Sequence, residues 1–271
     1  MFNILLHGFA RRGELLNCEA LYAQLRRTRA EAAQGGGGGG GDDDEVGAGA
    51  ALAPDVYTFN GLIRAAVQGG RPRRALAYRR LMRKEGVAAN VVTVSLLAAA
   101  HSASGQPLRG VEEARRLLAS GELRRLDRAS YGRLLAACAE AGRGRGGDGG
   151  GGGGLRAMRR AAAAPLAAVS AEAAAARDQA LWLEQTLRAD RRARGLLAEP
   201  HATFHLIRTL GNAGDFEGAR RVFEAAPRPR PELVWSEMLR CCNVCGEPAF
   251  ASDVLASEAG AQAGITSTKR L

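Results

Sequence analysis

Asparagine and serine side chains recur at one fixed place in the sequence, ten residues ahead of a glycine. The first three cases are Asn3 before Gly13, Asn60 before Gly70 and Ser95 before Gly105. An amide or a hydroxyl both donates and accepts hydrogen bonds, so such side chains can recognise the polar edge of a partner molecule. Asparagine and serine are also favoured as helix caps whatever the function, and spacing alone does not separate the two roles.

The same spacing continues along the chain, with a glycine, a phenylalanine and a further serine in the first position. The further cases are Gly132 before Gly142, Phe204 before Gly214 and Ser236 before Gly246. A leucine or methionine follows two residues after every first position, at Leu5, Leu62, Leu97, Leu134, Leu206 and Met238. Asn60 and Ser95 lie 35 residues apart, and a fixed period of this length indicates a solenoid of repeats. Six imperfect units fit in the 271 residues.

Each unit is predicted to be a pair of helices, as residues 56–90 illustrate. Their first apolar stripe has helical spacing and consists of Phe59, Leu62, Ile63, Ala66 and Val67. Gly69, Gly70 and Pro72 end this helix and allow a second one, which Gly86 closes. A single hairpin cannot bury its own apolar face, so the units must stack. We therefore predict an all-α fold, a right-handed α-solenoid of about six helical hairpins.

Two glycine-rich insertions interrupt the period, and their low apolar content cannot offset the entropy of ordering, so both are predicted to be disordered. The second separates the two helices of the fourth unit, whose partner helix resumes near Ser170 as a predicted N-cap. The predicted boundaries are repeat 1 at 1–25, the Gly/Asp-rich insertion at 26–54, repeat 2 at 56–90, repeat 3 at 91–127, repeat 4 at 128–199 with its Gly/Ala-rich insertion at 143–178, repeat 5 at 200–231 and repeat 6 at 232–264.

Composition favours a polyanionic partner. The net charge is +10, which suggests nucleic acid, although arginine-rich helices can also be simply soluble. No run of eighteen apolar residues is present, so we expect no membrane span.

Residues for catalysis are sparse. Cys242 and Cys245 form a C-x-x-C pair without a second pair at zinc-like spacing, and we expect them to pack in the core. The four histidines form no recognisable ligand set, and the glycine runs lack the Lys-Ser/Thr ending of a phosphate loop. We therefore predict no enzyme activity, no cofactor and no metal.

The units resemble pentatricopeptide repeats. Residues 56–90 carry the family's V-x-T-Y/F-N-x-L-I phrase at Val56, Thr58, Phe59, Asn60, Leu62 and Ile63, followed by Gly70, Ala75, Met82, Gly86 and Asn90. The resemblance extends to 1–25, 91–105, 128–142, 200–226 and 232–256. The W-x2-L-G-x2-Y signature of tetratricopeptide repeats is not found.

The resemblance implies sequence-selective binding of single-stranded RNA, with one base read per repeat. In the family, the fifth and last residues of a unit contact the base. Carried over residue by residue, Asn3 with Asp55 implies uracil, Asn60 with Asn90 a pyrimidine, and Ser95 with Asp127 guanine. Gly132 has no side chain to read with. In the fifth unit the alignment leaves Phe204 or His205, and in the sixth it gives Ser236.

The resemblance also implies an organellar member of algal or plant type, acting in the mitochondrion or chloroplast in RNA processing, stability, splicing or translation. Met1 falls inside a first helix, so we interpret the chain as a fragment or Met1 as a misassigned start. Two alternatives stay open: a scaffold for protein partners, such as an RNA-processing complex, and the repeat portion of a larger RNA-processing enzyme. RNA binding predicts that Asn60, Asn90 and Ser95 are exposed along a basic face.

Overall fold

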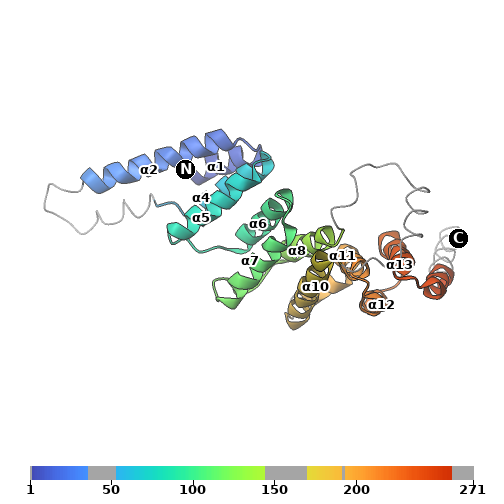
Figure 1. The fold of residues 1–271 in the computed structure, drawn as a ribbon. Helices are drawn as coiled ribbons and strands as arrows, with labels where there is room; N and C mark the ends of the chain where they lie inside the picture. The colour runs from blue at the N-terminus through green and yellow to red at the C-terminus, as the bar shows by residue number, and fades with distance from the viewer. Residues whose placement is uncertain (1, 36–52, 144–169, 191–192, 258–271) are drawn as a thin grey trace, which may run out of the picture. The chain divides into compact units, whose positions relative to one another are not determined.

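The protein is described here from a computed structural model, which describes residues 2–35, 53–143, 170–190 and 193–257. Within these ranges every regular element is a helix and none is a strand (Figure 1). The chain divides into two compact units, Met1–Leu126 and Asp127–Leu271. The predicted all-α class is confirmed, and the right-handed course of the whole array stays a prediction.

The first unit contains three successive helical hairpins. Its helices are α1 (Phe2–Arg11), α2 (Leu15–Gly35), α4 (Val56–Gln68), α5 (Pro72–Lys84), α6 (Val91–Ala103) and α7 (Pro107–Ala119). The first helix of each hairpin packs on the first helix of the next, so α4 lies between α1 and α6. Each second helix packs on its own partner, as the sequence predicts.

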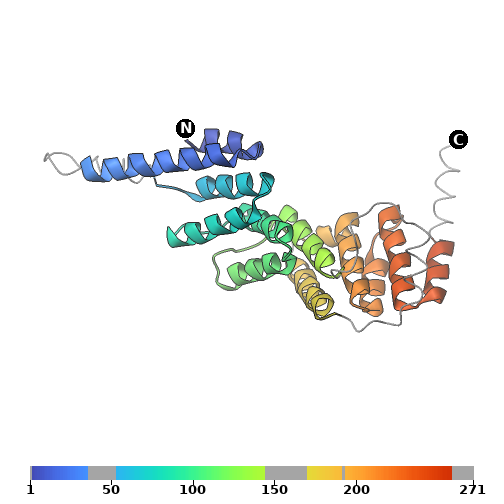
Figure 2. The ribbon, with the colours of Figure 1, turned by 45° about the horizontal axis from the view of Figure 1, so that its top comes forward.

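The second unit follows the same plan. Its helices are α8 (Arg128–Ala141), α10 (Ala171–Ala189), the short 3-10 helix η1 (Arg194–Ala198), α11 (Pro200–Asn212), α12 (Phe216–Ala225), α13 (Glu232–Cys245) and a last helix at 248–257. The first helices α8, α11 and α13 again pack in sequence (Figure 2). Nothing in the sequence pattern had indicated η1, which connects α10 to α11.

The glycines that mark the period are the turns of the hairpins. Five of the six have left-handed backbone, with φ between 71° and 79° at Gly13, Gly105, Gly214 and Gly246 and 68° at Gly70, whereas Gly142 keeps φ at −67°. After α4, the Gly70 N–H donates to Val67 O and the Arg71 N–H to Ala66 O, at 3.1 and 2.7 Å. This pattern satisfies the last carbonyls of the helix and reverses the chain.

Predicted apolar stripes form the core. Phe59, Leu62 and Ile63 of α4 have no exposed surface, and neither has Met82 of α5. Every first helix must face both its own partner and the next hairpin, which is why these stripes are wide. At Gly110, where α7 crosses α6, an added Cβ would lie 2.9 Å from the Ala98 Cα. The backbone of α7 therefore packs directly against the backbone of α6 at this point.

The predicted insertions need correction at their edges. Residues 26–35 are not disordered, because α2 continues through them to Gly35. This segment is rich in arginine and alanine, which favour helix, and glycines begin only at its end. Helix α10 begins at Ala171 behind Ser170, whose side chain accepts a hydrogen bond from the Ala173 N–H, so residues 171–178 belong to the repeat. Two predictions fall outside the described residues: the disorder of 36–52 and 144–169, and the end of repeat 6 at 258–264.

A search of the described residues finds no helix with the length and apolar character needed to cross a membrane.

Candidate nucleic-acid interface

The first predicted reading pair is joined directly by a hydrogen bond. Asn3 of α1 donates from Nδ2 to the Asp55 carboxylate at 3.0 Å. Asp55 is the N-cap of α4 and accepts from the Thr58 N–H at 2.8 Å, within a capping box. The Thr58 hydroxyl donates to Oδ1 of the Asn3 side-chain amide at 3.0 Å. A side chain of one hairpin is thus bound to the cap of the next.

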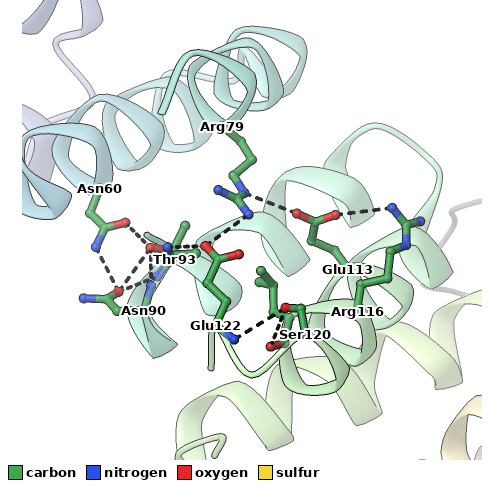
Figure 3. Close-up of polar contacts among 10 residues, drawn as sticks. Asn60, Arg79, Asn90, Thr93, Glu113, Arg116, Ser120 and Glu122 are labelled. Atoms are coloured by element: carbon green, nitrogen blue, oxygen red, sulfur yellow. Dashed lines mark hydrogen bonds and ion pairs between the residues drawn. The ribbon is translucent and has the colours of Figure 1, made fainter. Parts of the chain in front are cut away.

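The second predicted pair repeats this arrangement (Figure 3). Asn60 of α4 donates from Nδ2 to Asn90 Oδ1 at 3.1 Å, and the Thr93 hydroxyl donates to Asn60 Oδ1 at 2.7 Å. Asn90 is the N-cap of α6, again with a capping box that involves Thr93. We call the six residues Asn3, Asp55, Thr58, Asn60, Asn90 and Thr93 the cap ladder.

Asn60, at the centre of the cap ladder, is less exposed than predicted. Asn3 is exposed and Asn90 half-buried, but only 7% of the Asn60 surface is exposed. The expectation that Asn60 lies open on the surface is therefore wrong, because Asn90 and Thr93 of the next hairpin cover and bind its amide. Since an amide has two N–H groups and an oxygen with two lone pairs, these two bonds fix its orientation without exhausting its capacity.

The third predicted pair is placed differently. Ser95 is half-buried in α6 of the first unit, while Asp127 is the exposed N-cap of α8 and accepts from the Ser130 N–H at 2.8 Å. Asp127 is the first residue of the second unit, so the pair is divided between the two units. The cap role of Asp127 matches Asp55 and Asn90, whereas its reading role with Ser95 stays a prediction.

Two of the later candidate reading positions, Gly132 and His205, line a cleft of about 630 Å³ in the second unit. Gly132 lines this cleft, and a Cβ added there would meet nothing within 4 Å. His205 lines it as well, whereas Phe204 is not among its lining residues. Ser236 does not line the cleft: it is exposed on α13, and its hydroxyl donates to the Leu233 carbonyl of its own helix at 3.4 Å. Of the two residues aligned for the fifth unit, His205 is therefore the one beside Gly132.

Two kinds of residue in the interface escaped the sequence analysis. The first is a threonine three residues after the helix cap, Thr58 or Thr93, whose hydroxyl bonds the asparagine amide of the preceding hairpin. The recurring D/N-x-x-T phrase in the sequence could have indicated it. The second is the residue two after the cap. Tyr57 is 68% exposed and Val92 36% exposed, so each leaves an apolar side chain in solvent beside a reading pair.

The arginines considered for phosphate contacts are not equivalent. Arg71 and Arg73 are exposed at the start of α5, the second helix of the second hairpin, and Arg64 is half-buried in α4. Arg74 is exposed but lies 3.2 Å from the Glu19 carboxylate, so its charge is already paired within the protein. Arg71 and Arg73 are the better candidates for contacts with a phosphate backbone.

The cysteines and histidines offer no metal centre in the ranges that the structure describes. Cys242 is buried, as expected for core packing, and the nearest thiol pair is Cys241 and Cys245, whose sulfur atoms lie 4.0 Å apart one helical turn from each other. The C-x-x-C spacing was therefore a misleading signal.

Comparisons with known proteins agree with the sequence pattern. Residues 1–28 match the model of the PPR repeat, and residues 50–101 match the model of the pentatricopeptide repeat domain. These two segments are thus similar to pentatricopeptide repeats, and the cap ladder lies within the matched residues. No curated protein matches the chain.

Two solved structures are similar to it: the pentatricopeptide repeat protein PPR10 in complex with an 18-nt psaJ RNA element, and a triple cysteine-to-serine variant of PPR10 with the same element. Each has 18% sequence identity and a TM-score of 0.40, with 95% of this chain covered. The chain spans 33% of the length of those proteins.

Proposed function

We propose that this protein binds single-stranded RNA sequence-selectively, with one base read at each pair of the cap ladder. The observation that carries the proposal is the repetition of the ladder. In two successive hairpins an asparagine of one first helix bonds the cap of the next, with a threonine fixing the asparagine amide. A cap that served only its own helix would not require a partner from the neighbouring hairpin.

The ladder supplies both parts of a base site. The amide of Asn60 and the cap residue Asn90 present donors and acceptors, which can pair with the polar edge of a base. Exposed Tyr57 and Val92 flank this pair and offer surfaces on which base faces can stack. A splayed single strand exposes edges and faces together, whereas a duplex hides both.

We further propose that the protein acts by occupying a transcript in a mitochondrion or chloroplast, in RNA processing, stability, splicing or translation. Its repeats supply binding groups, and no catalytic step is assigned to them. The net charge of +10 supports the electrostatic part of such binding.

The sharpest test converts the second pair into the first. Asn90→Asp gives Asn60 the same partner type that Asn3 has in Asp55, and aspartate is as good an N-cap as asparagine. Fluorescence anisotropy with labelled strands should show that the wild type prefers pyrimidine-containing single strands over purine strands and duplex. Asn90→Asp should keep the fold and shift the preference at one base toward uracil, by roughly 5-fold for a hydrogen bond of about 1 kcal/mol.

Asn17→Asp is the matched control, because Asn17 is an exposed amide on α2 that bonds only Glu14. It makes the same change of charge outside the ladder and should leave the base preference unchanged. An equal response of the two variants, or wild-type binding that ignores base identity, contradicts base reading.

A protein-binding scaffold is the second candidate. It is favoured by the apolar side chains that the first hairpin leaves in solvent, Ile4 at 76% and Leu16 at 66% exposed. Complete failure to bind RNA in the same assay would favour this candidate.

A further inference from the structure

A small cleft lies between α5, α6 and α7 of the first unit. Its volume is about 180 Å³, below the ~300–1,000 Å³ of sites for drug-sized ligands, so it suits a single small group. Four arginines line it, Arg79, Arg80, Arg83 and Arg109, and Glu113 is the one acid among its lining residues. The balance of charge favours an anion.

Arg79 is the buried residue of this cleft, with only 8% of its surface exposed. Its Nε donates to Glu113 Oε1 at 3.2 Å, and its Nη2 lies 3.8 Å from Glu122 Oε1 (Figure 3). The third nitrogen, Nη1, is buried without a hydrogen-bond partner. Because a guanidinium stays charged, Nη1 keeps two donors that nothing in the protein satisfies.

His101 contributes a second unsatisfied atom to the same cleft. Its Nδ1 is buried and has no partner, and burial lowers the pKa of the ring below its ordinary value. Leaving a buried polar group unpaired costs about 1–3 kcal/mol, and two such groups on one cleft indicate a missing polar ligand. The Arg79 guanidinium can only donate, so this ligand must be an acceptor. The Gln106 amide lies on the same wall.

We propose that this cleft binds a phosphate group. A tetrahedral oxyanion accepts several hydrogen bonds at once, and guanidinium groups donate in the fork geometry that suits it. Arg79 Nη1 supplies the buried donors, while Arg80, Arg83 and Arg109 supply charge from the exposed rim. The phosphate is either free inorganic phosphate or the monoester of a small nucleotide. The site is separate from the cap ladder and does not depend on base reading.

Isothermal titration calorimetry of the whole chain tests this site with three probes at constant ionic strength: inorganic phosphate, uridine 5′-monophosphate and uridine. We expect saturable binding of inorganic phosphate at one site. Binding of the nucleotide with an equal or higher affinity would identify a monoester as the source, whereas preference for inorganic phosphate would identify the free ion. Uridine should not compete with phosphate.

Two variants assign the binding to the cleft. Arg79→Lys keeps the charge beside Glu113 but removes Nη1, and Arg109→Gln removes an exposed charge from the rim without disturbing the core. Each should weaken phosphate binding roughly 10-fold or more, since a charge-assisted hydrogen bond is worth about 1.5–3 kcal/mol. Circular dichroism checks that both variants are folded. If Arg79→Lys does not fold, the comparison rests on Arg109→Gln alone.

Arg27→Gln is the control, because Arg27 is an exposed arginine of α2 that does not line the cleft. It should bind phosphate as the wild type does. Absence of saturable binding, or equal weakening by Arg27→Gln and Arg109→Gln, overturns the proposal. Neither result would bear on RNA reading, which is measured separately through the base preference.

Discussion

At the scale of single residues, Thr93 connects the stability of the first unit to its candidate function. Its buried hydroxyl donates to the Asn60 amide and accepts from the Asn90 N–H at 3.1 Å. It therefore holds the cap of one helix and the amide of another in one geometry. The same position in the first pair is occupied by Thr58.

Thr93→Val keeps the shape of this side chain but leaves two buried polar groups without their partner. We expect a loss of about 1–3 kcal/mol in the free energy of unfolding and a weaker base preference. Urea denaturation measures the first effect. Thr28→Val is the control, because the Thr28 hydroxyl bonds only the Gln24 carbonyl of its own helix. A similar loss in both variants would show that the ladder adds nothing beyond ordinary helix contacts.

His205 gives the second unit a dependence on pH. Burial, with Arg208 nearby, lowers the pKa of the ring from 6.5 to about 4. The unfolded chain therefore binds a proton more readily than the folded one. The stability that the neutral ring contributes is complete above pH 6.5 and is lost as the pH falls toward 4.

We expect the wild type to lose more thermal stability than His205→Gln between pH 7 and pH 4. Differential scanning calorimetry at several pH values measures the difference. Parallel pH profiles for the two proteins would contradict the assignment, since carboxylate titration is common to both.

The sequence predicts those parts of the candidate site that leave a repeated pattern and misses those that depend on how the helices pack. The period identified Asn3 and Asn60, and the resemblance to pentatricopeptide repeats supplied their partners Asp55 and Asn90. Burial of Asn60 was not visible, because it depends on the helix of the next hairpin. The cleft around Arg79 was also hidden, since its arginines belong to two helices, α5 and α7, and follow no period.

At the scale of elements, hairpins are limited by how closely their helices approach. Gly110 allows α7 to meet the α6 backbone at Ala98, and Gly211 of α11 similarly leaves room for Cys241, whose sulfur would lie 2.7 Å from an added Cβ. Gly132 of α8, in contrast, is exposed and has open space around it. The sequence does not distinguish these three glycines, although two of them allow close helix packing and the third is exposed.

Gly110→Ala should destabilise the first unit by about 1–3 kcal/mol, because the neighbouring backbone cannot move aside as a flexible side chain would. Gly132→Ala, the control, should stabilise by up to about 1 kcal/mol through helix propensity alone. Chemical denaturation compares the two. A stabilising Gly110→Ala would mean that α6 and α7 can separate freely.

Helix boundaries were predicted well where turn glycines and caps mark them and poorly elsewhere. The turns at Gly70 and Gly105 and the cap at Ser170 were identified because each leaves a local chemical signal. The extension of α2 to Gly35 was missed because a glycine run drew the boundary too early. Helix η1 was missed because no period or strong cap announces it.

At the scale of the whole molecule, charge and base reading should respond differently to salt. With about three phosphates neutralised, affinity for single-stranded RNA should fall roughly 20-fold between about 50 and 200 mM salt. The ratio between pyrimidine and purine strands should change little, because hydrogen bonds to base edges release no counterions. Anisotropy across a salt series measures both quantities. A preference that vanishes together with affinity would indicate that charge alone produces it.

The cap ladder also determines where the chain could be divided for engineering. Sequence similarity draws the edges of the second repeat at Val56 and Asn90, yet the bonds that fix Asn60 run to Asn90 and Thr93. A segment transplanted with the conventional edges would carry the asparagine and its cap but leave behind the threonine that orients the amide. The portable block therefore runs from Asn60 to Thr93, and custom arrays assembled from such blocks would keep each recognition group intact across the junction.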